Sequence, residues 1–265
     1  MKYNKQLREA MDEIARVAGY LWQQGWAERN GGNISYNITG WDDARLGRLK
    51  PLTPQVRLPQ AVGHLKGGFF IVTGTGCRMR HVAERVMDNA AIIRISADGT
   101  GYCIVAEQVV MPTSELPSHL MIHDYLKAQG RDVRVVMHTH PTELVAMTHN
   151  PKLLGKDVLS KLLWSMIPET RAFCPKGVGI VPYTLPGSVE LARRSIEQLE
   201  KHDVVLWEKH GALAVGENLT EAFDMVDTLS KSAKIYVAAC SMGFKPEGMS
   251  DAQMDELARA FDLPG

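Results

Sequence analysis

The chain of 265 residues lacks a charge imbalance, a secretory signal and a long apolar run. Lysine plus arginine and aspartate plus glutamate number 30 each, so the formal net charge is zero. A nucleic-acid-binding protein usually carries a basic excess, and we therefore expect no nucleic-acid partner. No apolar run is long enough to span a bilayer and no apolar signal core opens the chain, so we expect no membrane partner.

Cysteine is scarce and scattered. Cys77, Cys103, Cys174 and Cys240 form no Cys-x-x-Cys pair, which argues against a disulfide framework and against a cysteine-type zinc site. Reduced thiols are typical of the cytoplasm, and we expect that location. The hydrophobic share of 45% and the charged share of 23% are ordinary for a globular protein whose core is stable without disulfides or structural metal ions.

No repeat, low-complexity tract or linker divides the chain, so residues 1–265 are predicted to form a single domain. Apolar periodicity predicts helices over about 5–25 (with Trp22 among its apolar positions), 115–126, 188–201, 220–239 and up to 261, and a mainly helical stretch over 141–173. Strands are predicted near 34–38, 69–72, 92–95, 102–105 and 178–181, and around His138 and His210. The segment 40–66, rich in Gly, Pro and charge, is predicted to be a surface excursion. Because several links between strands are short, we predict an α/β fold with a central mixed or antiparallel sheet and helices on both faces.

The most informative motif is His138-Thr-His140, which follows a β-branched run and precedes Pro141. Residues two apart on a strand share a face, so two imidazoles form half of a divalent metal site. A second strand leads to His210, and Glu115 is a candidate fourth ligand. Three histidines with a carboxylate or water describe a catalytic zinc site. The alternative is that His-x-His only ends a strand, with both imidazoles hydrogen-bonded.

Two glycine-rich strings have the composition of anion-binding loops. Glycines in Asn30-Gly-Gly-Asn33 let backbone N–H groups approach a ligand, and the asparagines add donors. Thr73-Gly-Thr-Gly76 follows an apolar strand and suits a phosphate, but it is neither a Walker loop nor a dinucleotide fingerprint. The alternative for both strings is an ordinary tight turn.

The string Pro-Thr113-Ser114-Glu115 enters a predicted helix and has two readings. Thr113 or Ser114 caps the helix and Glu115 complements its dipole, or Glu115 lies beside the metal as ligand or general base. On the same helix, His119 and His123 are interpreted mainly as packing residues or supports of the site, because no zinc-protease pattern surrounds them.

Taken in order, Gly-Gly-Asn, Thr-Gly-Thr-Gly, Pro-Thr-Ser-Glu, His-x-His and a distal His-Gly resemble the class II aldolase/adducin family, from about residue 20 to residue 243. The resemblance implies that His138, His140 and His210 bind one Zn²⁺ ion per subunit and that Glu115 is the catalytic carboxylate. It assigns the substrate phosphate and hydroxyl groups to Asn30, Gly31, Asn33, Thr75, Gly76, Thr113 and Ser114. It also implies a homotetramer with active sites at subunit interfaces, where Glu169 of a neighbouring subunit reaches the site as a second catalytic carboxylate.

The reaction that this resemblance implies is a metal-dependent aldol cleavage of a small phosphorylated ketose. The strings are most similar to those of family members acting on L-rhamnulose 1-phosphate, with dihydroxyacetone phosphate and L-lactaldehyde as products. The alternatives are cleavage of L-fuculose phosphate, epimerisation of a pentulose phosphate and dehydration. A non-enzymatic scaffold such as adducin is less consistent with three retained histidines, and an unrelated zinc hydrolase lacks support from a His-Glu-x-x-His string.

Overall fold

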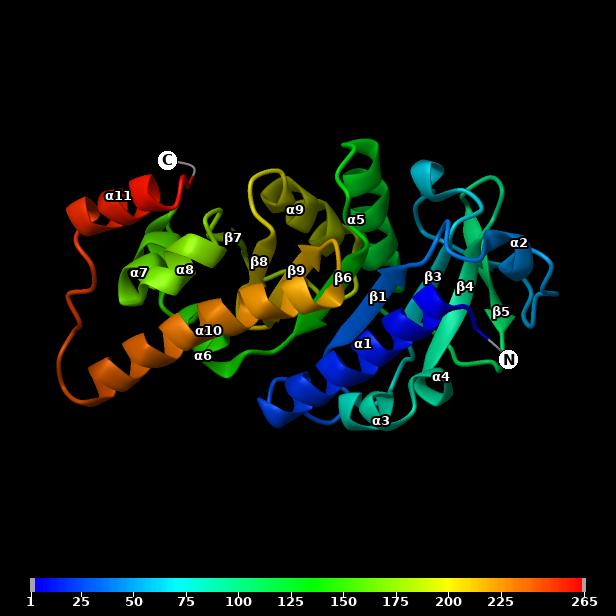
Figure 1. The fold of residues 1–265 in the computed structure, drawn as a ribbon, viewed down its shortest axis with the longest axis horizontal. Helices are drawn as coiled ribbons and strands as arrows, with labels where there is room; N and C mark the ends of the chain where they lie inside the picture. The colour runs from blue at the N-terminus through cyan, green and yellow to red at the C-terminus, as the bar shows by residue number, and fades with distance from the viewer. Residues whose placement is uncertain (1–2, 264–265) are drawn as a thin grey trace.

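A nine-stranded sheet organises the computed structural model, which describes residues 3–263 (Figure 1). The strands are β1 (Asn33–Asn37), β2 (Val56–Arg57), β3 (Phe69–Thr73), β4 (Ala90–Ile95), β5 (Gly101–Ala106), β6 (Val135–Thr139), β7 (Val178–Val181), β8 (Val204–Trp207) and β9 (Gly211–Gly216). Their order across the sheet is β2-β5-β4-β3-β1-β6-β9-β8-β7. Only β7 and β8 pair in parallel among these strands of residues 3–263, so the predicted mixed sheet is confirmed.

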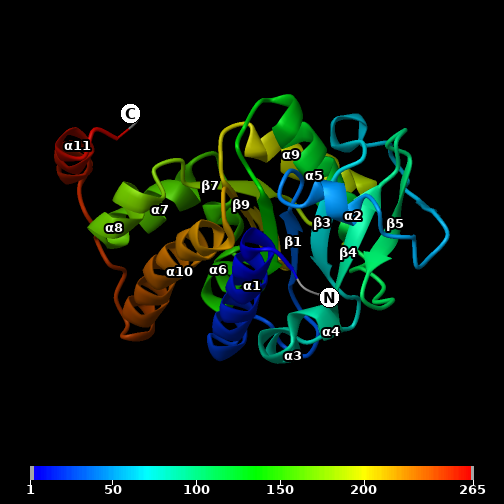
Figure 2. The ribbon, with the colours of Figure 1, turned by 45° about the vertical axis from the view of Figure 1, so that its right-hand side comes forward.

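Helices cover both faces of this sheet, as predicted, and each face has its own apolar core. One face packs against α1 (Lys5–Gln23), α3 (Met79–Glu84), α4 (Val86–Asn89), α6 (Thr142–Met147) and α10 (Leu219–Ser241). The other packs against α5 (Leu116–Ala128), α9 (Val189–Leu199) and the short 3-10 helix η1 (Gly63–Leu65). Figure 2 shows α7 (Val158–Met166), α8 (Pro168–Phe173) and α11 (Asp251–Ala260) at one end of the molecule, beyond the sheet. The remaining short helices are α2 (Asp43–Leu46) and η2 (Pro151–Leu153).

Local sequence signals explain where several helices begin. Asn4 accepts a hydrogen bond from the backbone N–H of Leu7 at the start of α1, and Ser188 does the same for Leu191 at the start of α9. Before α11, Ser250 and Gln253 form the reciprocal capping box that the sequence predicts. Each of these side chains satisfies a backbone donor that the first helical turn leaves free.

The structure corrects the prediction for two stretches. Trp22 does not belong to the buried stripe of α1, because it lies in the last turn beyond Leu21 and is 50% exposed. The segment 40–66 is a surface excursion only in part, since Leu46 and Leu65 are fully buried and β2 adds an edge strand beside β5. The short helices α3 and α4 are not predicted, because one or two turns show no measurable periodicity.

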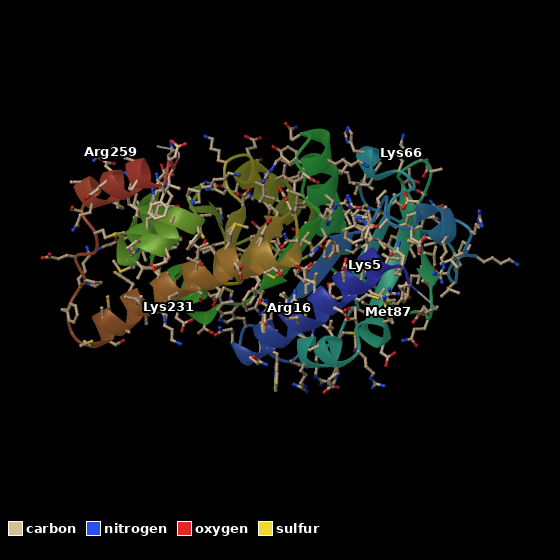
Figure 3. The ribbon with its side chains drawn as sticks, viewed as in Figure 1. Lys5, Arg16, Lys66, Met87, Lys231 and Arg259 are labelled. Carbon is tan, nitrogen blue, oxygen red and sulfur yellow. The ribbon has the colours of Figure 1, made fainter. Side chains whose placement is uncertain are left out.

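The surface carries charged side chains of both signs. Lys5, Lys66 and Arg259 are exposed examples at separate points of the molecule (Figure 3). Within residues 3–263, no helix combines the length and the apolar character needed to cross a membrane. The four cysteines are free thiols, as their spacing predicts.

Candidate active site

Three imidazoles lie close together at the C-terminal end of β6. His138 is the fourth residue of β6, His140 follows the end of that strand, and His210 lies in the turn between β8 and β9. One ring nitrogen from each histidine lies within 4.8 Å of the others, and this is the one group in residues 3–263 in which three or more His, Cys, Asp or Glu side chains could hold a metal ion. The predicted association of these residues is therefore present in the fold.

Hydrogen bonds fix the orientation of two of the rings. Nδ1 of His138 donates to the carbonyl oxygen of Ala212 at 3.0 Å, and Nδ1 of His140 donates to a carboxylate oxygen of Glu28 at 2.7 Å. A carbonyl and a carboxylate only accept, so both protons lie on Nδ1 and both Nε2 atoms present lone pairs. These two Nε2 atoms are 3.1 Å apart, and a ring nitrogen of His210 lies within 4.8 Å of them. Two facing lone pairs with a third imidazole beside them fit a divalent cation bound between the rings.

Burial keeps His138 and His210 neutral. Desolvation, followed by the neighbouring charges of His140 and His210, holds the pKa of His138 well below its ordinary value. Burial is also the main cause that lowers the pKa of His210 to about 4. Neutral imidazole is the form that binds metal, so both groups are ready to act as ligands at neutral pH.

The turn that carries His210 is anchored from a neighbouring helix. The backbone N–H of Lys209 donates to Oγ1 of Thr148 at 2.8 Å, and that of His210 donates to the Trp207 carbonyl at 3.0 Å. Lys209 has a φ of 60°, a left-handed conformation within the three-residue loop that joins β8 to β9. Trp207 itself is buried and packs against the His138 ring at 4.4 Å between centroids.

Glu115 faces the triad from the start of α5. Its Oε2 accepts a hydrogen bond from Nδ2 of Asn33 at 2.7 Å and lies 4.0 Å from Nε2 of His138. The N-cap residue of α5 is Glu115, and its side chain makes no capping hydrogen bond, although the hydroxyl of Thr113 accepts from the backbone N–H of Glu115 at 3.3 Å. The Glu115 carboxylate is therefore turned toward Asn33 and His138 instead of capping the helix. Burial raises the pKa of the Glu115 carboxyl, while the Asn33 hydrogen bond opposes that shift. A buried carboxylate with a raised pKa is suited to proton transfer.

The two glycine-rich strings form the walls of the site. A cavity of about 200 Å³ opens over the triad, and it is lined by Asn30, Gly31, Gly32, Asn33, Gly74, Thr75, Gly76, Thr113, Ser114, Glu115, His138, His140 and His210. A Cβ atom at Gly31 would lie 2.9 Å from Nδ1 of His140, and Gly32 has a φ of +77°. Glycine is therefore required here by close approach to a candidate ligand and by backbone conformation.

All predicted site residues except one line this cavity. Glu169 lies in the first turn of α8 and contributes instead to a separate cavity of about 600 Å³, with Trp26 and Lys231 among its neighbours. Within one chain Glu169 and the histidines are thus in different places.

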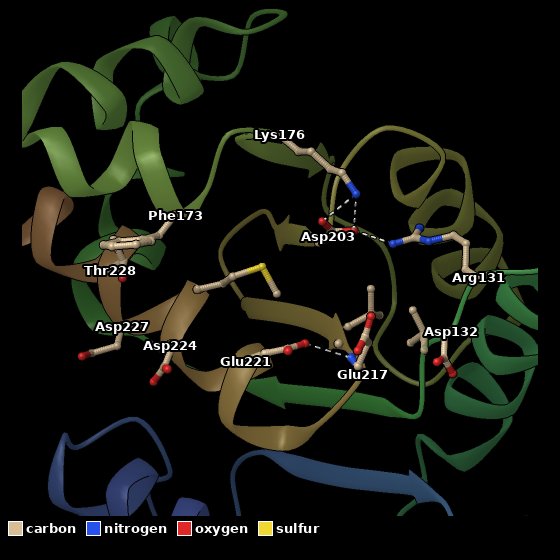
Figure 4. Close-up of a pocket in the computed structure, with 14 residues that line it drawn as sticks. Arg131, Asp132, Phe173, Lys176, Asp203, Glu217, Glu221, Asp224, Asp227 and Thr228 are labelled. Carbon is tan, nitrogen blue, oxygen red and sulfur yellow. Dashed lines mark hydrogen bonds and ion pairs between the residues drawn. The ribbon is translucent and has the colours of Figure 1, made fainter. Parts of the chain in front are cut away.

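Figure 4 shows a larger cavity of about 710 Å³ that contains none of the predicted site residues. Lys176 and Arg131 form ion pairs with Asp203 on one side of it, whereas Glu221 and Asp224 line the other side. Carboxylates repel a phosphorylated substrate, and the cations are already paired. The smaller cavity over the histidines is therefore the candidate active site.

Sequence reasoning missed Glu28, which orients His140. Its side chain is 67% exposed, and no local pattern indicates a partner 112 residues away in the chain. Its place beside the Asn30–Asn33 loop is the only signal that points toward the site.

The comparisons with known proteins agree with this geometry. The family described as Class II Aldolase and Adducin N-terminal domain matches residues 12–237. A rhamnulose-1-phosphate aldolase of Bacteroides thetaiotaomicron is 52% identical, covering 97% of this chain and 96% of that protein. One from Enterococcus faecalis is 35% identical, covering 96% and 91%. The solved structure of a sugar-phosphate aldolase from Thermotoga maritima has a TM-score of 0.79 and 33% identity, covering 92% of this chain and all of that chain. The chain belongs to the class II aldolase and adducin family.

Proposed function

We propose that the protein is a zinc-dependent aldolase that cleaves L-rhamnulose 1-phosphate into dihydroxyacetone phosphate and L-lactaldehyde. The observation that carries this proposal is the triad of imidazoles beside a buried carboxylate, at the bottom of a cavity lined by glycines and hydroxyl groups. The names of the relatives from Bacteroides and Enterococcus support the choice of substrate.

The cleavage separates C3 from C4 of the ketose. The C4 hydroxyl loses its proton and becomes the aldehyde of L-lactaldehyde, while the electron pair of the broken bond stays with the three-carbon fragment. A divalent ion held by His138, His140 and His210 would supply positive charge that stabilises the oxygens of that fragment. Protonation of C3 then completes dihydroxyacetone phosphate.

Glu115 is the group that we assign to proton removal from the C4 hydroxyl. Its carboxylate is buried, faces His138 and is held by the amide of Asn33. A base must lie within hydrogen-bond reach of the proton that it removes, and Glu115 lines the cavity in which we place the ketose.

The phosphate is assigned to the two glycine-rich strings. The Asn30 amide and the hydroxyls of Thr75 and Ser114, together with backbone N–H groups of Gly32 beside Gly31 and of Gly76, are the donors that we assign to it. Anchoring the phosphate at the wall holds the ketose so that the steps at C3 and C4 occur within one complex.

Glu169 enters the proposal only through a second subunit. Because it lies outside the cavity of its own chain, its assigned role as the donor that protonates C3 requires an active site between subunits, and we assign this arrangement to a homotetramer. A cytoplasmic location, with zinc as the resident ion, completes the proposal. Imidazole ligands and a small phosphorylated sugar substrate are consistent with both.

The test is a product assay with purified protein. Zinc-loaded protein is incubated with L-rhamnulose 1-phosphate, and release of dihydroxyacetone phosphate is measured with and without a chelator. We expect rapid release that the chelator abolishes and added zinc restores. A folded, zinc-bound protein that releases nothing from this ketose but cleaves L-fuculose 1-phosphate would overturn the substrate assignment.

A further inference from the structure

A row of buried polar groups continues from the candidate active site into the protein interior. Asn33 and Ser35 are two residues apart on β1 and share one face of the strand. On α5, the positions Glu115, His119 and His123 are spaced by four residues and share one face of the helix. The two rows therefore face each other across the packing between strand and helix.

Three hydrogen bonds join the rows. Asn33 donates to Glu115 at 2.7 Å. Deeper in the protein, the hydroxyl of Ser35 lies 2.8 Å from Nδ1 of His119 and 2.9 Å from Nε2 of His123. Ser35 and His119 are fully buried, and His123 is 2% exposed.

The hydroxyl of Ser35 has one proton, so it cannot donate to both rings. It donates to one imidazole and accepts from the other, or it accepts from both. Either arrangement makes Ser35 the shared partner, because the remaining ring nitrogens, Nε2 of His119 and Nδ1 of His123, are buried without a partner. Burial lowers the pKa of each imidazole to about 3, so the cluster is neutral at neutral pH.

Apolar side chains of similar size would fill this position without leaving unpartnered ring nitrogens. The cluster also adds directional contacts that a purely apolar interface lacks, since a hydrogen bond fixes the distance and angle between β1 and α5. β1 is paired with β6, and Asn33 is opposite His138 in that register. The position in which α5 packs on β1 therefore determines where Glu115 lies relative to the metal ligands.

We propose that Ser35, bonded to both His119 and His123, is a positioning residue that sets α5 against β1 and so holds Glu115 in its working place beside the histidine triad. Ser35 touches neither the cavity nor the substrate that we assign to it. It acts through Glu115, and this inference rests on the proposed role of that carboxylate.

The test is a double-mutant cycle on the full-length, zinc-loaded protein. kcat, KM and bound zinc are measured for the wild type, Ser35→Ala, Glu115→Gln and the double variant. We expect Ser35→Ala to lower kcat about 10- to 100-fold, the usual effect of displacing a catalytic group by up to about 1 Å. KM and zinc content should be unchanged. In the Glu115→Gln background we expect no further loss, because the group that Ser35 positions is already inactive.

Two controls separate positioning from packing. Ser160→Ala removes another buried serine hydroxyl, which accepts from the backbone of Val178 far from the site, and should leave kcat unchanged. Ser35→Thr keeps the hydroxyl on a strand that accepts β-branched residues and should restore most of the rate. If Ser35→Ala does not fold, His123→Gln takes its place in the same cycle.

An equal loss of kcat from Ser35→Ala in both backgrounds would overturn the positioning role, and so would a wild-type kcat for Ser35→Ala. The assignment of Glu115 is judged separately in the same cycle. A wild-type kcat for Glu115→Gln alone would show that the proposed function of the carboxylate has failed, whatever Ser35 does.

Discussion

The carboxylate of Glu28 and the imidazole of His140, 112 residues apart in the chain, are joined by a hydrogen bond of 2.7 Å. This bond leaves Nε2 of His140 free and turned toward Nε2 of His138, 3.1 Å away. A surface carboxylate thus decides which nitrogen of a candidate ligand is available. A carboxylate partner of this kind fixes the tautomer and the ring orientation of a metal-binding histidine, which strengthens metal binding.

We therefore expect Glu28→Gln to weaken zinc binding by about 10- to 100-fold, the range typical of partners that orient metal ligands. Zinc affinity is measured by competition with a fluorescent chelator. Glu190→Gln is the matched control, because Glu190 is an exposed carboxylate that pairs with Arg194 on α9. Equal zinc affinity in Glu28→Gln and the wild type would contradict the orienting role.

Removal of the metal ligand His140 should reduce zinc binding more than removal of Glu28, which only orients it. We expect His140→Ala to lose bound zinc and to lower activity by about 1,000-fold or more, since a metal ion contributes several kcal/mol to such reactions. Zinc content and dihydroxyacetone phosphate release are measured on the same sample. His149→Ala, at an exposed position, is the control. Full activity of a metal-free His140→Ala protein would remove the metal from the proposal.

Two residues that line the cavity, Thr75 and Asn33, should affect different kinetic constants. Thr75 lines the cavity and is assigned to the phosphate, so Thr75→Ala should raise KM for the phosphorylated ketose about tenfold and change kcat little, because one hydrogen bond to a charged group is lost. Asn33→Ala should instead lower kcat, since Asn33 Nδ2 holds Glu115. Steady-state kinetics on both variants distinguish the two roles. If Thr75→Ala impairs cleavage of an unphosphorylated ketose equally, Thr75 does not contact phosphate.

Much of this site follows from sequence, because its residues lie in local patterns with a physical meaning. His-x-His on a strand puts two imidazoles on one face, and glycine beside asparagine marks a loop where a Cβ has no room, as at Gly31. The mixed sheet with helices on both faces follows from short links between apolar strands.

Other features depend on contacts between distant segments and leave no local pattern. The bond between Glu28 and His140 and the anchoring of Lys209 by Thr148 join residues more than 60 positions apart. The same holds for the buried side of segment 40–66, where Leu46 and Leu65 are covered by different parts of the core. Trp22 illustrates the converse, because helical periodicity cannot show whether a side chain at the margin of the apolar stripe of α1 is covered by neighbouring elements.

The buried imidazoles of His119 and His123 should make the fold sensitive to acid. Burial lowers the pKa of each to about 3 in the folded protein, whereas an unfolded chain protonates histidine near pH 6.5. Below about pH 6.5 the unfolded state therefore binds more protons than the folded state, so the free energy of unfolding decreases as the pH falls toward 3. Each group contributes about 1.4 kcal/mol per pH unit over that window.

Urea unfolding of the metal-free protein at pH 7.5 and pH 5.5 measures this effect. The decrease in the free energy of unfolding between the two pH values should be about 1.4 kcal/mol smaller for His123→Gln than for the wild type, because one imidazole no longer titrates on unfolding. His149→Gln removes an exposed imidazole and controls for the loss of one histidine. Metal-free samples are required, since zinc release on acidification would add its own pH dependence. An identical decrease in His123→Gln and the wild type would mean that His123 binds its proton in the folded protein as readily as in the unfolded chain. In that case the hydrogen bond with Ser35 would have to form with a charged ring, and the neutral cluster between β1 and α5 would not exist in solution.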